Sequence, residues 1–126
     1  MMTDSVQRLH AAIEQAREGD PARSRTARLF GDGMPKMAKK LAEEAVEIGI
    51  AALQDQRRET ILESADLIYN LVALWSAMGI VPEEIWDELD RRERLYGIAE
   101  KLPKPRFPDR SKRQRPLKLA NGETRR

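Results

Sequence analysis

The sequence predicts an all-α protein, on three observations. Its 126 residues are 35% charged, 40% hydrophobic and only 5% aromatic. No long run of β-branched or aromatic residues alternates with polar ones, as a half-buried strand would require. Apolar residues recur at helical spacing instead, for example at Val6, Leu9 and Ile13. A chain of this length fits one modest domain, in which a large internal cavity is not expected.

The first helix is expected to follow residues 3–5, which offer Thr, Asp and Ser as capping side chains. It should end at residues 19–21, where Gly, Asp and Pro follow one another. The segment after it contains Arg23, Arg25 and Arg28 and leads to two glycines near position 32. We interpret this segment as a polar connection.

Three further helices complete the predicted body of the protein. One runs from about Pro35 to Gln54, with an apolar stripe at helical spacing. The next runs from about Arg58 to Met78 and stops at a glycine. The last opens with Pro82, a residue that suits the first turn of a helix.

Composition excludes several classes of protein. The chain has no cysteine, so disulfides, thiolate catalysis and zinc–sulfur sites are ruled out. Its single histidine, His10, excludes multi-histidine metal sites unless subunits pool their ligands. Any metal site must be built of carboxylates. The N-terminus lacks the apolar core of a signal peptide, and the most apolar stretch, residues 67–81, is too short and too polar for a membrane span. We therefore expect a soluble, cytoplasmic protein without a membrane partner.

The net charge of +2 hides an asymmetry between two parts of the chain. Residues 1–100 carry 13 basic and 19 acidic side chains, whereas residues 101–126 carry 10 basic and 2 acidic ones. The second part also holds four of the seven prolines. We expect it to be a basic tail, at least partly disordered, that either attracts polyanions weakly or folds over a neighbouring anionic substrate.

Acidic residues gather on the second and third predicted helices. Glu44 and Glu47 lie one turn apart, and Glu63 and Asp66 belong to an acidic stripe on the third helix. Nearly all other positions of that helix are apolar, so it should be buried. Buried carboxylates cost several kcal/mol each unless a cation or hydrogen bonds compensate them. Something positive must therefore face the stripe.

An ordinary solvated face, with Lys36, Lys39 and Lys40 as salt-bridge partners, is the alternative for the second helix. The third helix argues against it, because residues 62–75 contain no Lys or Arg. Two facing acidic stripes suit Mg²⁺ or Mn²⁺, and four or five carboxylates favour more than one ion. Such ions attract polyphosphate oxygens. No glycine-rich phosphate loop is present, so phosphate binding must depend on the metals and basic side chains.

Four segments, Ser24–Leu29, Lys39–Glu47, Glu63–Asn70 and Gly97–Lys101, resemble in this order the phosphoribosyl-ATP pyrophosphatases of histidine biosynthesis. These belong to the wider MazG-like all-α nucleotide pyrophosphohydrolases. The resemblance implies a compact four- to five-helix bundle that is completed by dimerisation. It also implies Mg²⁺ at the acidic motifs and hydrolysis between the α and β phosphates, with release of pyrophosphate. The enzyme domain would then be residues 1–100.

The resemblance and the geometry of the second helix together suggest a division of roles. Glu43 points slightly aside from the other acids and is suited to orient the attacking water or accept its proton. The expected metal ligands are Glu44, Glu47, Glu63 and Asp66. The expected substrate-binding residues are Lys40, Arg25, Arg28, Asn70 and Lys101, most of them through phosphate oxygens.

Dimerisation is also expected from the third helix itself. Leu71, Leu74 and Trp75 demand more cover than three other short helices supply. Subunits should therefore pair and complete each other's sites.

Some positions depart from the pattern of the biosynthetic enzymes. Ala42 stands where they usually have Gly, Asn70 where they have His and Tyr96 where they have a small Ser, and residues 101–104 also differ. None of these is a metal-binding carboxylate, so the reaction type follows from the resemblance more closely than the substrate does. Phosphoribosyl-ATP ranks first, and another nucleoside triphosphate, removed in pool sanitation, is the alternative. A helical module that binds nucleic acid through its tail is the alternative of another class, but it leaves the partnerless acids unexplained.

Overall fold

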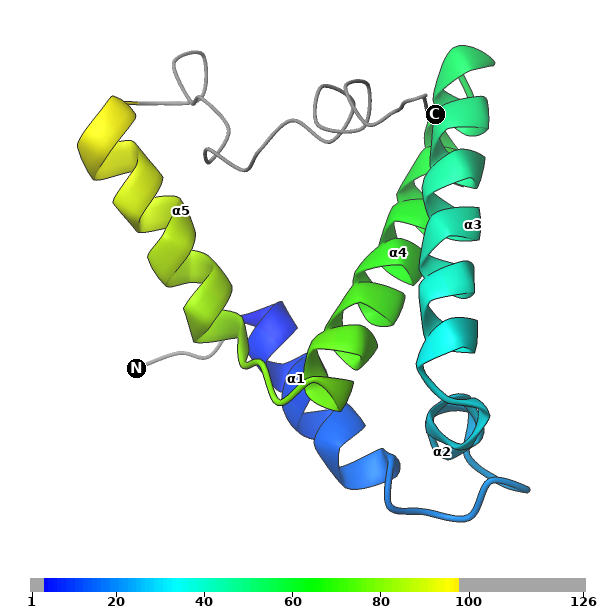
Figure 1. Cartoon of the computed structure of the whole chain (residues 1–126). Coiled ribbons are helices and arrows are strands. Elements are labelled where there is room, and N and C mark those ends of the chain that lie inside the picture. Colours follow the sequence, from blue (N-terminus) through cyan, green and yellow to red (C-terminus); the bar gives the residue numbers. More distant parts are fainter. Residues whose placement is uncertain (1–3, 98–126) are drawn as a thin grey trace, which may run out of the picture. The chain divides into compact units, whose positions relative to one another are not determined.

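The computed structural model describes residues 4–97, which contain five α-helices and no strand. The helices are α1 (Ser5–Ala16), α2 (Arg25–Asp32), α3 (Met34–Leu53), α4 (Arg57–Ala77) and α5 (Pro82–Tyr96) (Figure 1). The predicted all-α class is confirmed. The chain divides into two units, Met1–Glu88 and Leu89–Arg126, and the site described below lies in the first.

The longest helices, α3 and α4, form an antiparallel hairpin and lie side by side (Figure 1). A short turn joins them, and Asp55 adopts a φ of 56° in it. Aspartate tolerates this left-handed conformation better than most residues do, because its short polar side chain can hydrogen-bond locally. The hairpin brings the acidic motifs of the two helices onto neighbouring turns.

The expected polar connection around residues 23–33 is wrong in its central part, because residues 25–32 form the helix α2. The Ser24 hydroxyl accepts a hydrogen bond from the amide of Ala27 and so caps the helix. Thr26, Ala27 and Leu29 are buried, whereas Arg25 and Arg28 are exposed. Gly33, at a φ of 90°, ends α2 and begins α3 directly afterwards.

The hydrophobic core lies where α1, α2 and α3 meet the C-terminal half of α4. Its buried side chains are Ile13, Leu29, Met37, Val72, Ala73 and Trp75. The start of α5 joins this core through Ile85 and through Trp86, whose ring meets that of Trp75 edge to face at 6.4 Å. One end of the α3/α4 hairpin is therefore held firmly.

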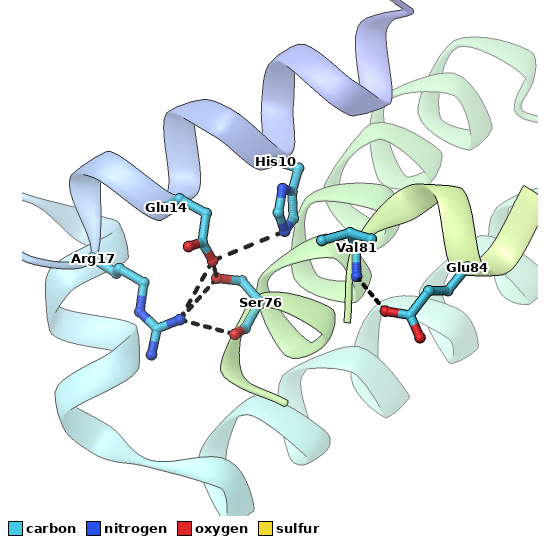
Figure 2. Close-up of polar contacts among 6 residues, drawn as sticks. All are labelled: His10, Glu14, Arg17, Ser76, Val81 and Glu84. Atoms are coloured by element: carbon cyan, nitrogen blue, oxygen red, sulfur yellow. Dashed lines mark hydrogen bonds and ion pairs between the residues drawn. The ribbon is translucent and has the colours of Figure 1, made fainter. Parts of the chain in front are cut away.

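A polar cluster fastens α1 to the end of α4 (Figure 2). Arg17 donates from Nη1 to the carbonyl oxygen and to Oγ of Ser76, at 2.8 and 3.0 Å. The Ser76 hydroxyl donates to the carboxylate of Glu14, and His10 Nε2 lies 3.9 Å from the same carboxylate. The hydrogen bond from Ser76, with the charges of Arg17 and His10, lowers the pKa of Glu14.

The other end of the hairpin is less covered than the sequence suggested. The expectation that the third predicted helix is buried holds only for its C-terminal half, where all its buried residues lie. Nearer its start Ile61 is 54% exposed and Leu62 46%, and on α3 Val46 is 61% exposed. The physical reason is that the core residues that α1 and α2 contribute lie at the other end, so that, among the described helices, this part of α4 packs mainly on α3.

Within residues 4–97 no single helix is both long and apolar enough to cross a membrane, and α4 with α5 meets such a test only as a bent pair.

Candidate active site

The carboxylates of Glu44 on α3 and of Glu63 and Asp66 on α4 form the centre of the candidate site. One oxygen of each lies within 4.8 Å of the others. All three side chains are partly buried. Like charges this close repel one another strongly away from bulk water, so the arrangement is unfavourable without a proton or a cation among them.

The pKa values of the cluster record this repulsion. The hydrogen bond with Glu44, together with burial and the charge of Glu44, raises the pKa of Glu63. The charge of Glu63 and burial raise the pKa of Glu47, and Glu43 and Asp66 add to the effect. Glu63 and Glu47 therefore bind a proton more tightly than isolated carboxylates do, and an oxygen-liganded cation could relieve the same repulsion.

Two further observations fit a cation at this centre. Oε1 of Glu44 is buried and has no hydrogen-bond partner within the described part of the chain. None of Lys36, Lys39 and Lys40 forms a salt bridge with a carboxylate among residues 4–97. The alternative of a salt-bridged surface face is thus not what these residues adopt. Three oxygen donors without a positive partner are a donor set suited to Mg²⁺ or Mn²⁺.

A cavity of about 360 Å³ opens between α2, α3 and α4. Its lining is mainly cationic, with one carboxylate and two polar side chains of α4. The lining residues are Arg25, Arg28, Leu29, Asp32, Lys36, Lys40, Tyr69 and Asn70. Three of the predicted phosphate-binding residues therefore surround one space, and the unforeseen helix α2 places two of them.

Tyr69 forms a wall of this cavity and was not foreseen as a site residue. Its hydroxyl lies 2.7 Å from that of the buried Thr26, and the guanidinium of Arg25 stands 4.8 Å from the centre of its ring. These contacts fix the ring between α2 and α4 and hold Arg25 at the cavity. Once residues 25–32 are read as a helix, the sequence shows that Thr26 shares the buried face of α2 with Leu29.

Lys36 is the second unforeseen residue. It lines the cavity from α3, one turn before Lys40. The spacing of four residues from Lys40, a predicted substrate-binding residue, could have revealed it, but Lys36 was considered only as a salt-bridge partner. Asp32, the one carboxylate of the lining, was also missed.

Asn70 lies where expected, on the same side of α4 as Asp66, but it is 3% exposed. Its Nδ2 donates to the carbonyl oxygen of Asp66 at 2.9 Å. Its Oδ1 is buried and lacks a hydrogen-bond partner in the described residues. Asn70 therefore belongs to the wall of the cavity. Its free group is a hydrogen-bond acceptor, which can pair with a donor but not with a phosphate oxygen.

Glu43 and Glu47 lie on the exposed side of the cluster. Glu47 is next to Glu63, as its raised pKa records, but it is outside the set of three converging carboxylates. Glu47 and Glu63 also line a second hollow of about 350 Å³ with Ile50 and Glu59. Lys101 falls outside the described residues, as does the predicted tail.

Within residues 4–97, the carboxylate cluster on a helical hairpin and the cationic cavity beside it are features suited to an all-α enzyme that acts on phosphate groups with the help of a metal ion. A family model described as phosphoribosyl-ATP pyrophosphohydrolase matches residues 6–93. This chain belongs to that family. The matched range includes all the candidate site residues except Lys101.

Curated relatives agree with this assignment. Phosphoribosyl-ATP pyrophosphatase 2 of Rhodopseudomonas palustris is 59% identical over 106 residues, which cover 84% of this chain and 81% of the relative. The protein of the same name from Bradyrhizobium diazoefficiens is 56% identical over 103 residues, or 82% and 77% of the two chains. Phosphoribosyl-ATP pyrophosphatase of Gluconobacter oxydans is 46% identical over 101 residues, or 80% and 76%. The chain is therefore an enzyme, and the non-enzymatic alternative is set aside.

Proposed function

We propose that this enzyme hydrolyses phosphoribosyl-ATP between its α and β phosphates, in a reaction that depends on Mg²⁺, and releases phosphoribosyl-AMP and pyrophosphate. The observation that carries the proposal is the cluster of Glu44, Glu63 and Asp66, three carboxylates with no cationic partner among the described residues. The names of the relatives supply the substrate. The step belongs to histidine biosynthesis, and its proposed setting is the cytoplasm.

Glu44, Glu63 and Asp66 would hold the cation, with Glu47 as the fourth ligand at the exposed edge. A bound Mg²⁺ or Mn²⁺ supplies charge to phosphate oxygens and lowers the pKa of a coordinated water. The number of ions stays open, and the crowding of carboxylates favours more than one.

The remaining roles fall to side chains of the chain itself. Glu43 lies beside Glu47 at the exposed edge, where a carboxylate can orient the attacking water or accept its proton. Lys40, Arg25 and Arg28 line the cavity next to the cluster and can neutralise phosphate oxygens. Asn70 would bind the substrate from the cavity wall, where its Oδ1 can accept a hydrogen bond from a hydroxyl or amino group.

We further propose that two subunits pair through the uncovered end of the α3/α4 hairpin. Several large apolar side chains there are more exposed than a monomer ordinarily leaves them, among them Val46, Ile50, Leu53, Ile61 and Leu62. A partner that covers this surface would also exclude water from the neighbouring carboxylates. The pairing would thus complete the site.

A substrate screen tests the proposed function. Pyrophosphate release is measured with phosphoribosyl-ATP, ATP and the other common nucleoside triphosphates, each with Mg²⁺ and with excess chelator. We expect the highest kcat/KM for phosphoribosyl-ATP and no turnover with chelator. A higher kcat/KM for an ordinary nucleoside triphosphate would move the enzyme to pool sanitation, the alternative left open by Asn70 and Tyr96.

A further inference from the structure

The cationic cavity carries more positive charge than the binding of a single phosphate group requires. Arg25 and Arg28 approach from α2 and Lys36 and Lys40 from α3, while Asp32 is the only acid that the described part of the chain contributes to the lining. The cavity is therefore lined by four positive charges and one negative charge. Such a surplus, held against the partly buried hairpin, matches a ligand that carries several negative charges on adjacent groups.

The cavity also lies directly beside the carboxylate cluster. Lys40 and Glu44 are four residues apart on α3, and Asn70 and Asp66 are four residues apart on α4. Because a helix rises about 1.5 Å per residue, each pair is separated by about 6 Å along its axis. Lys40 and Asn70 therefore place one edge of the cavity next to the carboxylate cluster.

The opposite side of the cluster has the opposite character. The hollow there is lined by Glu47, Glu59 and Glu63, with Ile50, Ala51 and Gln56, and no cation of residues 4–97 is among its lining. A second polyanionic group would be repelled by these carboxylates. The two hollows on either side of the carboxylate cluster therefore differ in character: one is cationic, and the other is acidic and partly apolar.

We infer that the cationic cavity holds the β and γ phosphates of the substrate, so that it is the binding site of the departing pyrophosphate, and that Lys36 is one of its ligands. The inference rests on the proposed function. Lys36 would bind the pyrophosphate through its positive charge and its position in the cavity lining.

This placement has a chemical consequence for the hydrolysis. The water oxygen forms a bond to the α-phosphorus, and the bond from that phosphorus to the bridging oxygen breaks. The bridging oxygen leaves with the electron pair as part of pyrophosphate, while the proton of the water passes to Glu43 or to solvent. Negative charge therefore grows on the group that the cations surround, and they stabilise it more in the transition state than in the substrate.

Binding of inorganic pyrophosphate to the full-length protein tests the inference without any hydrolysis. Calorimetry is run with and without Mg²⁺ on the wild type, on Lys36→Gln and on Lys39→Gln. Lys39 is a matched control, since it is an exposed lysine of the same helix that does not line the cavity. Ribose 5-phosphate, a sugar monophosphate, is the second probe. Circular dichroism checks that both variants keep their helices.

We expect Lys36→Gln to weaken pyrophosphate binding about tenfold, the size of one lost charge-assisted hydrogen bond. Lys39→Gln should stay close to the wild type, and the affinity for ribose 5-phosphate should be unchanged. Unchanged pyrophosphate binding in Lys36→Gln would overturn the inference. So would a loss confined to ribose 5-phosphate, which would place the phosphoribosyl group in the cavity. Neither result depends on which nucleotide the enzyme hydrolyses, so a failure of the proposed function would be seen separately.

Discussion

At the scale of single residues, the carboxylates of α3 and α4 differ more than their spacing in the sequence suggests. Glu44, Glu63 and Asp66 converge, whereas Glu43 and Glu47 lie at the exposed edge. In the proposed function the three converging carboxylates bind the metal with Glu47 as a further ligand, and Glu43 acts on the attacking water. Glu47 is the residue whose role the geometry leaves most open to experiment.

The first prediction separates Glu43 from Glu47. Glu43→Gln should lower kcat by about 100-fold or more while metal affinity is nearly kept, because a general base is lost but no ligand is. Glu47→Gln should instead weaken Mg²⁺ binding. Steady-state kinetics with metal-binding calorimetry measure both quantities. If Glu43→Gln loses as much metal affinity as Glu47→Gln, Glu43 is itself a ligand.

The second prediction concerns acid stability at the α1 to α4 contact. Because the pKa of Glu14 is lowered, its ionised form favours the folded state at pH values above the ordinary 4.5, and this contribution is lost as the pH falls through the lowered pKa. Ser76→Ala removes the two hydrogen bonds of the Ser76 hydroxyl, to Glu14 and from Arg17, and should reduce stability by about 2 kcal/mol at neutral pH, about 1 kcal/mol for each. Denaturant unfolding between pH 3 and pH 7 follows the difference, which should shrink at the acid end. A constant difference across that range would contradict the role given to Glu14.

Sequence alone could place the acidic residues, because their spacing and the absence of nearby cations on α4 are visible in the order of residues. It could not show which three converge, since that depends on the rotation of α3 against α4. Nor could it identify Tyr69, whose position is set by Thr26 and Arg25 from a different helix. Contacts between helices that are far apart in the chain carry this information.

At the scale of elements, four of the five helices could be predicted to within one or two residues at most ends. Their caps, apolar stripes and terminal glycines are local signals. The helix α2 was missed because it is short and three arginines in and around it obscure its apolar face. The burial of Thr26, Ala27 and Leu29 depends on contacts with the other helices, which the local sequence does not show.

The third prediction concerns the stability of the α3/α4 hairpin without metal. Since the pKa of Glu63 is raised, protonated Glu63 favours folding below its ordinary pKa of 4.5, and this stability is lost as the pH rises through the raised pKa. Glu63→Gln should therefore raise the melting temperature of the metal-free protein at neutral pH. Thermal unfolding in the presence of chelator measures this.

Added Mg²⁺ should stabilise the wild type by about 1.4 kcal/mol at ten times its dissociation constant, and Glu63→Gln far less. Glu59→Gln serves as the control, because Glu59 is an exposed acid one turn earlier on α4 and lies outside the converging set. An equal shift with Mg²⁺ in all three proteins would show that the cation binds elsewhere.

At the scale of the whole molecule, family membership covers residues 6–93 and the core closes only one end of the hairpin. The division into a domain of residues 1–100 and a tail stays a prediction, as does the pairing of subunits. An exposed apolar surface on α3 and α4 is what the pairing would cover.

The fourth prediction tests that pairing. Leu62→Glu places a charge in the exposed apolar surface and should shift the protein toward monomers, with loss of activity if the partner completes the site. Met78→Glu is the matched control, because Met78 is an exposed apolar residue just after α4, at the opposite end of the hairpin. Analytical ultracentrifugation over a range of concentrations reports the assembly. A fully active monomeric wild type would exclude the proposal.

The central claim is that the carboxylates of α3 and α4 hold the metal that drives hydrolysis, and one measurement tests it most directly. Pyrophosphate release from phosphoribosyl-ATP is followed at saturating Mg²⁺ for the wild type, Glu63→Gln and Asp66→Asn, with helical content checked in each. We predict turnover in the wild type that disappears with chelator, and a loss of at least about 1,000-fold in both folded variants. Wild-type turnover in either variant, or turnover that survives chelation, would contradict the account.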